Sequence, residues 1–326
     1  MRIRKGVKGM GAHNTAADRK KPLGQRIRNL KRYMPLYAML LPALIYLGIN
    51  NYLPMSGLVL AFKRYNAQQG IWGSEWIGAS NFKFLLESRE LPLLFRNTLG
   101  YNAAFIVVNL VVGVTLAILI TEITNLKYRK LSQSMILFPF VVSIVIVSYM
   151  VRAFLDPQAG LLNHIREAFG LEMVSWYDTE KYWPFILIFV NTWKGVGYGC
   201  ILYISSILGI DASLYESASL DGASKWKKIR YITLPFLKPT MITVTLLGIG
   251  RIFTSDFGLF YQVPQNSGLI SDVTQTIDTY VYKSLTSTSN IGMSAAASFF
   301  QSVMGFLMIM IFNTLTRKIS EENALF

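Results

Sequence analysis

The stretch Asn97–Thr121, NTLGYNAAFIVVNLVVGVTLAILIT, decides the fold class of this 326-residue chain. It lies between Arg96 and Glu122 and contains no charged residue. A helix crosses the hydrocarbon core of a bilayer in about 20 residues, and backbone amides in lipid must be hydrogen-bonded within their own segment. The stretch therefore predicts a membrane-spanning helix.

Other apolar runs of comparable length lie on both sides of this stretch. Together they predict an all-α integral membrane protein of about six spans, over residues 35–61, 97–121, 131–151, 182–208, 239–262 and 293–315. The fifth span is the least regular, because it contains Arg251 and Asp256. We assign residues 34–320 to one membrane domain, residues 1–33 to a basic N-terminal tail and residues 321–326 to a C-terminal tail.

Composition agrees with this prediction and excludes several other classes. Hydrophobic residues make up 52% of the chain and charged residues 15%, against about 25% charged in soluble domains. The net charge of +14 does not indicate nucleic-acid binding, because Lys and Arg flank the apolar runs instead of sharing a face with aromatic residues. One cysteine, Cys200, and two distant histidines, His13 and His164, predict no metal site.

Lys and Arg in the loops predict the orientation of the spans. With a cytoplasmic N-terminus, 21 of them fall in inner segments and 9 in outer segments. Cytoplasmic loops carry an excess of these residues. We therefore expect both termini in the cytoplasm.

The polar stretch at residues 209–238 is unusually structured for a loop between two spans. Asp211 or Ser213 can cap a short helix, and Gly222 can end it in the left-handed conformation. Ser224 can cap a second short helix, which we expect Pro235 to stop. Such short helices are unstable alone and should dock on another surface.

This stretch also carries a specific resemblance. Its segments Glu216-Ser217-Ala218, Asp221-Gly222-Ala223 and Ile232-Thr233-Leu234-Pro235 resemble the EAA loop of the permease subunits of binding-protein-dependent ABC importers, with Ser217 as the one departure. The resemblance implies the type I importer fold and a coupling helix seated in a cleft of an ATPase subunit. It assigns coupling roles to these residues: Glu216, Ser217, Ala218, Asp221, Gly222, Ala223, Trp226, Leu234 and Pro235.

The resemblance extends over roughly residues 35–320, and several blocks look like sugar permeases. It implies a multi-pass protein of a bacterial inner membrane that takes up an oligosaccharide by alternating access. The implied partners are a second homologous permease, two ATP-binding subunits and an extracytoplasmic solute-binding protein. The chain has no phosphate-binding loop of the Gly-x-x-x-x-Gly-Lys type. We expect no cofactor on this chain, with ATP and Mg in the partner ATPases, and no enzymatic activity.

Polar and aromatic residues within the spans are candidates for the solute pathway. Charges are costly in a bilayer unless they face a bundle interior or water, and sugar sites combine aromatic faces with hydrogen-bonding groups. The candidates are Trp193, Lys194, Tyr198, Tyr203, Arg251, Asp256, Phe257 and Tyr261. Lys194 and Asp256 can instead form a structural ion pair between the fourth and fifth spans.

Three other functions are compatible with parts of the sequence. An ABC permease for spermidine or phosphate would have the same loop. An ion-coupled secondary transporter should show internal repeats or broken helices in matching halves. A membrane enzyme acting on lipid-linked sugar would need paired acidic or metal-binding residues. The last two leave the loop at 209–238 without an explanation.

Overall fold

The computed structural model describes residues 23–87, 90–286 and 290–319. Most of the predicted N-terminal tail and the whole predicted C-terminal tail lie outside these residues. The described chain divides into two compact units, one up to Ser56 and one from Gly57 onward.

The first unit is a long helix with one irregular turn. Helix α1, Leu23–Leu47, continues through a π-helical turn, Gly48–Tyr52, into α2, Leu53–Met55. Pro54 is the second residue after this turn, and the Leu53 amide donates to the Gly48 carbonyl, five residues back. A proline ring crowds the carbonyl four residues before it, and the wider turn relieves that crowding. A helical run suited to membrane crossing extends over Tyr33–Phe62.

The second unit begins with small elements that connect to its first long helix. A 3₁₀ segment, Ser56–Phe62, leads into a two-stranded antiparallel ribbon in which Lys63 pairs with Trp76 and Arg64 with Glu75. The elements of this region are β1 (Lys63–Arg64), α3 (Gly70–Gly73), β2 (Glu75–Trp76) and α4 (Ser80–Glu87).

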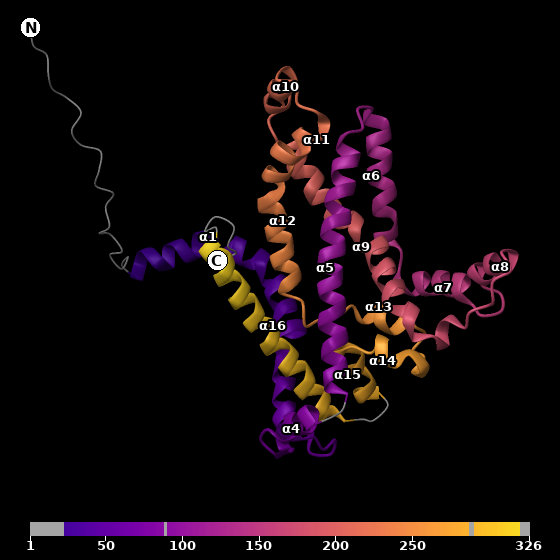
Figure 1. Ribbon diagram of the computed structural model, residues 1–326. Coiled ribbons are helices and arrows are strands. Elements are labelled where there is room, and N and C mark those ends of the chain that lie inside the picture. Colours follow the sequence, from indigo (N-terminus) through magenta and orange to yellow (C-terminus); the bar gives the residue numbers. More distant parts are fainter. Residues whose placement is uncertain (1–22, 88–89, 287–289, 320–326) are drawn as a thin grey trace, which may run out of the picture. The chain divides into compact units, whose positions relative to one another are not determined.

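Long helices form the body of the second unit (Figure 1). They are α5 (Leu91–Thr121), α6 (Leu126–Val141), α7 (Ile144–Leu155), α9 (Trp183–Leu208), α12 (Leu234–Ile249) and α16 (Ile291–Ile319). Shorter segments connect them: α8 (Leu161–Ala168), α10 (Ala212–Leu220), α11 (Lys225–Lys228), α13 (Phe257–Gln262), α14 (Ser271–Thr274) and α15 (Ile277–Thr286). Single 3₁₀ turns lie at Trp176–Asp178, Glu180–Tyr182 and Gly268–Ile270.

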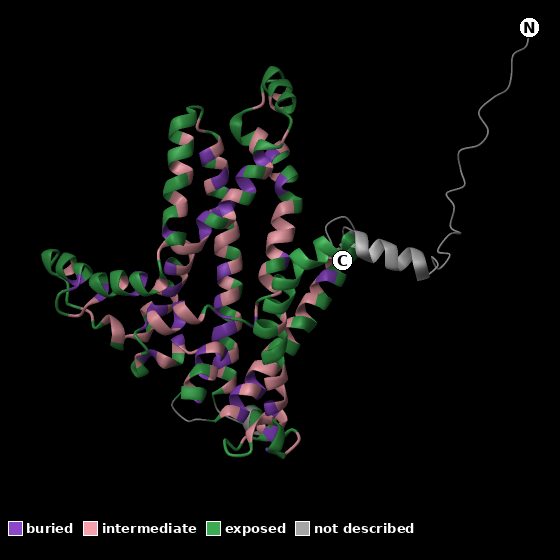
Figure 2. Cartoon of the chain, turned by 180° about the vertical axis from the view of Figure 1, so that it is seen from behind, coloured by how far each residue is buried: buried purple, intermediate pink, exposed green. Residues whose placement is uncertain are grey.

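Helices α5 and α9 pack together more extensively than any other described pair. Buried residues concentrate along them (Figure 2). An added Cβ at Gly113 of α5 would lie 3.2 Å from the Tyr203 ring of α9, and Gly197 of α9 lies directly against the Ile136 carbonyl of α6. Small residues at these positions let the helices approach closely.

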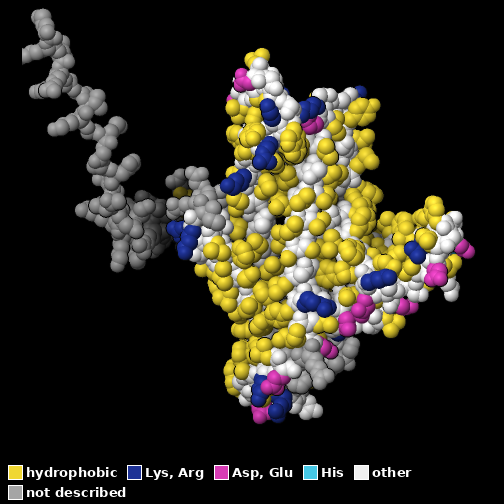
Figure 3. All heavy atoms as spheres, in the orientation of Figure 1, with side chains coloured by type: hydrophobic (Ala, Val, Ile, Leu, Met, Phe, Trp, Pro, Cys, Tyr) yellow, Lys and Arg dark blue, Asp and Glu magenta, His cyan; other side chains and the backbone are white. Residues whose placement is uncertain are grey.

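The outer surface of this bundle is apolar, as expected in lipid. Hydrophobic side chains cover much of the face shown in Figure 3, whereas Lys and Arg gather near α10 and α11. On α6, Met135, Phe138 and Val141 are all more than half exposed. Five described helices are long and apolar enough to span a membrane, or six if the bent pair α6–α7 counts as one span. The prediction of an all-helical membrane protein with about six spans is thus confirmed.

The third predicted span, 131–151, is not a straight helix. Helix α6 ends at Val141, and α7 leaves at an angle of 94° to it (Figure 1). Pro139 lies in the last turn of α6, where its missing amide removes a helical hydrogen bond. Ser143 then starts a new helix by accepting a hydrogen bond from the Val145 amide. The predicted range therefore contains two helices.

The fifth predicted span, 239–262, also differs from the structure. A helical run extends over Lys225–Ile249, and a turn then separates it from α13. Pro235 does not stop the second short helix as expected. A π-helical turn at Ile229–Thr233 precedes it, with the Leu234 amide donating to the Ile229 carbonyl. This wide turn accommodates the proline, as in the first unit.

Candidate functional site

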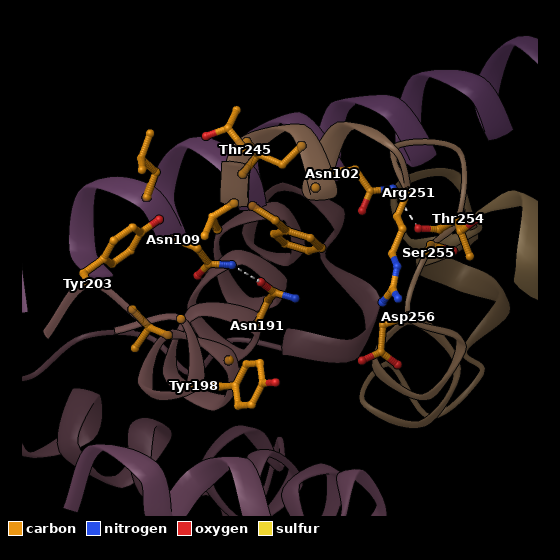
Figure 4. Close-up of a pocket in the computed structure, with 18 residues that line it drawn as sticks. Asn102, Asn109, Asn191, Tyr198, Tyr203, Thr245, Arg251, Thr254, Ser255 and Asp256 are labelled. Atoms are coloured by element: carbon orange, nitrogen blue, oxygen red, sulfur yellow. Dashed lines mark hydrogen bonds between the residues drawn. The ribbon is translucent and has the colours of Figure 1, made fainter. Parts of the chain in front are cut away.

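Helices α5, α9 and α12 and the turn after α12 enclose a cavity of about 630 Å³, here called the central cavity (Figure 4). Its polar lining residues are Asn102, Asn109, Asn191, Tyr198, Tyr203, Thr245, Arg251, Thr254, Ser255 and Asp256. On α5, Asn102 and Asn109 lie near the middle of a 31-residue helix. The cavity thus lies deep within the membrane-spanning part of the unit.

Two asparagines face each other in the central cavity. Asn109 Nδ2 donates to Asn191 Oδ1 at 3.0 Å, from α5 to α9. Asn109 Oδ1 is buried and has no hydrogen-bond partner among the described residues. Buried polar atoms are usually paired, and this acceptor is an exception among the described residues.

The turn between α12 and α13 presents Arg251 and Asp256 to the central cavity. Asn102 Nδ2 donates to the Ile252 and Thr254 carbonyls at 2.9 and 3.2 Å, which fixes the turn against α5. The side chain of Arg251 points toward Asp256 (Figure 4), but no ion pair joins them in the described chain. Asp256 Oδ1 accepts the Leu259 amide at 3.1 Å and so caps α13.

The carboxylate of Asp278, in α15, also holds the turn between α12 and α13 in place. Asp278 Oδ2 accepts from the amide and the hydroxyl of Ser255, both at 2.7 Å, and from Gln301 Nε2 at 3.0 Å. Gln301 Nε2 also donates to the Phe253 carbonyl. These bonds connect the cavity-facing turn to α15 and α16.

Four of the eight pathway candidates lie together at the central cavity. They are Tyr198, Tyr203, Arg251 and Asp256. Tyr198 stacks on Phe140 with ring centroids 5.0 Å apart, and its ring remains largely exposed. Tyr203 is almost fully buried and packs in the α5–α9 core. The assignment of all four to a solute pathway remains a prediction.

The other four candidates lie elsewhere. Trp193 packs against the apolar core around Trp183. Phe257 and Tyr261 stack on each other at 5.0 Å, and Tyr282 of α15 completes the aromatic cluster. None of these three lines the central cavity.

Lys194 stabilises the break between α6 and α7. Its Nζ donates to the Phe140 and Val142 carbonyls at 3.1 and 2.7 Å. These carbonyls lie where the helical ladder stops and would otherwise need another donor. The suggested ion pair with Asp256 is not formed in the described structure. Lys194 therefore donates to unpaired backbone carbonyls at the helix break instead of pairing with a carboxylate.

The glycines of α9 divide between packing and the central cavity. Gly197 packs against α6, whereas Gly195 and Gly199 line the cavity with no described atom within 4 Å of an added Cβ. Close packing of α9 on α6 therefore depends on Gly197, and the glycines two residues to either side of it face the cavity.

The segment Asp211–Thr233, here called the elbow, follows the C-terminal end of α9. Asp211 Oδ1 accepts the Ser213 amide at 2.9 Å, and this hydrogen bond lowers the pKa of the carboxyl. Gly222 has φ +74° and ends α10, with the Ala223 amide bonded to the Ala218 carbonyl at 2.9 Å. Ser224 begins α11 by accepting from the Lys227 amide.

The elbow is connected to the bundle and exposes apolar side chains. Lys225 Nζ forms an ion pair with Glu122 at the end of α5, 3.2 Å away. Leu220 is 90% exposed and Trp226 is 69% exposed. Glu216, Ser217, Asp221 and Pro235 are also exposed, whereas Ala218, Ala223 and Leu234 are partly buried. A well-capped elbow that exposes large apolar side chains among charged ones has the properties of a docking surface.

Comparisons with known proteins identify the family. Residues 111–321 match the model of the binding-protein-dependent transport system inner membrane component. The chain is 32% identical over 287 residues to the polygalacturonan/rhamnogalacturonan transport system permease protein YteP of Bacillus subtilis (strain 168), covering 88% of this chain and 89% of that one.

Solved structures give the same result. A crystal structure of a bacterial ABC transporter involved in the import of the acidic polysaccharide alginate matches with TM-score 0.83 and 31% identity, covering 91% of this chain and 99% of that one. The alginate transporter in complex with its pentasaccharide-bound periplasmic protein matches with TM-score 0.81 and 31% identity, covering 90% and 97%.

This chain therefore belongs to the inner membrane components of binding-protein-dependent ABC importers. Like its relatives, it is a multi-pass membrane permease subunit and not an enzyme. The recognition made from the elbow sequence and the expected importer fold are confirmed.

Proposed function

We propose that this chain is one of two permease subunits of an ATP-driven importer that carries an oligosaccharide across a bacterial inner membrane. The central cavity is the observation that carries the proposal. Its amides, hydroxyls and the exposed face of Tyr198 match the groups that bind sugar hydroxyls and ring faces. The relatives named for polygalacturonan and alginate support a sugar solute.

In this proposal Arg251 binds a carboxylate of an acidic sugar. Its guanidinium is exposed to the cavity and forms no ion pair within the described residues. Arg forms paired hydrogen bonds with carboxylates. Asn109 and Asn191 bind sugar hydroxyls through their amide groups, and Asp256 accepts from a further hydroxyl.

In this proposal the elbow transmits the movement of the ATPase subunits to the helices that line the central cavity. Leu220 and Trp226 provide apolar contacts for the ATPase cleft, and Glu216 provides a charged contact. Movement of the elbow reaches α5 through the Lys225–Glu122 ion pair and reaches α12 through the continuous helical run from Lys225 to Ile249. Both helices line the central cavity.

The proposed complex contains a second homologous permease, two ATP-binding subunits and an extracytoplasmic solute-binding protein. ATP and Mg bind in the ATP-binding subunits. Both termini of this chain and its elbow lie on the cytoplasmic side, and alternating access opens the pathway first to the binding protein and then to the cytoplasm.

Purification of the tagged chain from the membranes of its own organism tests this assembly. We expect a second six-span permease and an ATP-binding protein to co-purify in mild detergent. The ATP-binding protein should be lost when Glu216 becomes Lys and Leu220 becomes Asp in the same chain. A chain that purifies alone, and transports in liposomes without ATP, would contradict the proposal and favour an ion-coupled transporter.

A further inference from the structure

A second cleft, of about 270 Å³, lies at the base of the arm formed by α7 and α8, here called the outer cleft. It is lined by Arg152, Asp156, Pro157, Tyr177, Gln265 and Ser267. Five of these six residues have polar side chains. They come from three separate segments: the end of α7 with the loop after it, the 3₁₀ turn at Trp176–Asp178 and the loop after α13. The cleft is therefore assembled by the tertiary fold.

Tyr177 provides an unpartnered hydroxyl in this region. Its Oη is buried and has no hydrogen-bond partner among the described residues. Burial raises the pKa of Tyr177 to about 12, so the hydroxyl is protonated and can donate as well as accept. Its ring packs on Trp183 at 5.2 Å, which fixes the direction of the side chain.

Asp156 provides a charged acceptor in the outer cleft. Its Oδ1 accepts the amides of Gln158 and Ala159 at 3.0 and 2.9 Å. These backbone hydrogen bonds lower the pKa of the carboxyl, so it is ionised at neutral pH. Its Oδ2 has no hydrogen-bond partner in the described chain and remains available. Arg152 adds a donor of opposite charge.

A buried asparagine holds two of the three loops in place. Asn163 of α8 is fully buried and donates to the Pro157 and Val174 carbonyls, both at 2.9 Å. Its Oδ1 accepts from the Val174 amide at 3.1 Å and from Trp176 Nε1 at 3.0 Å. The loop with Asp156 and the loop with Tyr177 are thus fixed relative to each other, which is the preorganisation that a binding site needs.

The third loop carries backbone strain. Gln265 and Asn266 have φ of 56° and 50°, in the left-handed region, which asparagine tolerates but which is costly for glutamine. Ser267 Oγ then donates to the Tyr177 carbonyl at 3.2 Å. The strained turn therefore holds the Gln265 and Ser267 side chains beside Tyr177. Such strain often accompanies a functional constraint.

The outer cleft lies at the opposite end of α9 from the elbow. Tyr177 precedes the first residue of this 26-residue helix, and the elbow follows its last residue. The helix is about 39 Å long at 1.5 Å per residue, enough to cross a bilayer. An elbow on the ATPase side therefore puts the outer cleft on the side from which solute arrives.

A short helix connects the outer cleft with the central cavity. Asp256 lines the cavity and caps α13, and Gln265 of the cleft follows the end of α13 by three residues. The six residues of α13 extend about 9 Å. An extended sugar chain is long enough to contact both places.

We propose that the outer cleft is a binding subsite for one sugar ring of the transported oligosaccharide, on the entrance side of the central cavity. The inference rests on the proposed function. Vicinal hydroxyls of the ring bind Asp156 and Arg152, and the Tyr177 hydroxyl bonds a third polar group. The combination of a carboxylate, a guanidinium and neutral donors is suited to a polyhydroxylated ring.

Photo-cross-linking with the assembled transporter tests this subsite. The probe is a galacturonic acid trisaccharide with a diazirine at its reducing end, applied to the complex without its binding protein. We expect labelled peptides that contain residues 152–157 or 265–267, with unmodified trisaccharide competing. Tyr177→Phe removes the hydroxyl alone and should weaken competition about threefold to tenfold, as the loss of one hydrogen bond does.

Tyr182→Phe is the matched control, because Tyr182 packs on Trp176 nearby but does not line the cleft. It should leave competition unchanged. Labels confined to the central cavity, or equal competition in Tyr177→Phe and wild type, would overturn the subsite and leave the proposed function intact. A complex with no sugar label anywhere and no ATP-dependent sugar uptake would overturn both.

Discussion

Substitutions at three neighbouring glycines of α9 can test helix packing and solute contact separately. Gly197 packs on α6, whereas Gly195 and Gly199 line the central cavity. An added Cβ at Gly197 would lie 2.7 Å from the Ile136 carbonyl carbon and closer to its oxygen, whereas real Cβ atoms essentially never come within 3.0 Å of such atoms. The obstacle is the backbone of α6, which cannot rotate away as a side chain can. Gly197→Ala must therefore separate α6 from α9.

The expected cost follows from overpacking of a close contact. Inserting a methyl group into a well-packed core costs about 1–3 kcal/mol, and a backbone obstacle puts this site at or above the upper value. Gly195→Ala and Gly199→Ala meet no described atom within 4 Å. They should be neutral or stabilise by up to about 1 kcal/mol, because alanine favours helix over glycine.

The assay is thermal unfolding of the purified transporter complex in one detergent, followed by sugar uptake in proteoliposomes. Gly197→Ala should lower the melting temperature, and the other two variants should not. Gly195→Ala and Gly199→Ala should instead reduce uptake, because their methyl groups enter the central cavity. A Gly197→Ala complex as stable as Gly195→Ala would refute the close contact between α6 and α9.

Three more substitutions test the helix break, the cavity and the elbow. Lys194→Met leaves two carbonyls at the α6–α7 break without their donor and should cost about 2–4 kcal/mol in thermal or denaturant unfolding, whereas the exposed Lys181→Met should cost little. Arg251→Gln removes the proposed partner of a solute carboxylate. It should reduce uptake of a galacturonic acid trisaccharide at least about tenfold and uptake of a glucose trisaccharide much less. Equal losses for the two sugars would argue against an acidic solute. Gly222→Val forces a β-branched residue to φ +74° and should uncouple ATP hydrolysis from uptake while the complex stays in the membrane; normal coupling would contradict the role of the elbow.

Much of the fold could be predicted from the sequence, because lipid imposes strict rules on backbone hydrogen bonds. Uncharged runs such as Asn97–Thr121 identified the spans, and Asp211, Gly222 and Ser224 identified the elbow through its caps. The break between α6 and α7 was missed, because the chain is apolar on both sides of the break and no polar segment separates the two helices. Pro139 was the available signal for it.

The central cavity was predicted only in part, for a physical reason. Lys194 bonds to backbone carbonyls, which have no signature in a sequence, so its partners could not be found by matching charges. The pair Asn109 and Asn191 was missed, although amides in a span are costly without partners and are therefore informative. Which polar residues face one cavity depends on how α5, α9 and α12 rotate against one another, and the sequence alone does not determine this.

ATP-driven uptake of a defined sugar tests the central claim most directly. Proteoliposomes would hold this chain with its second permease and ATPase subunits, with binding protein outside and ATP inside, and a labelled galacturonic acid trisaccharide would be measured. We predict accumulation that requires both ATP and the binding protein. Uptake driven by an ion gradient without ATP, or transport of spermidine or phosphate but not of the sugar, would contradict it.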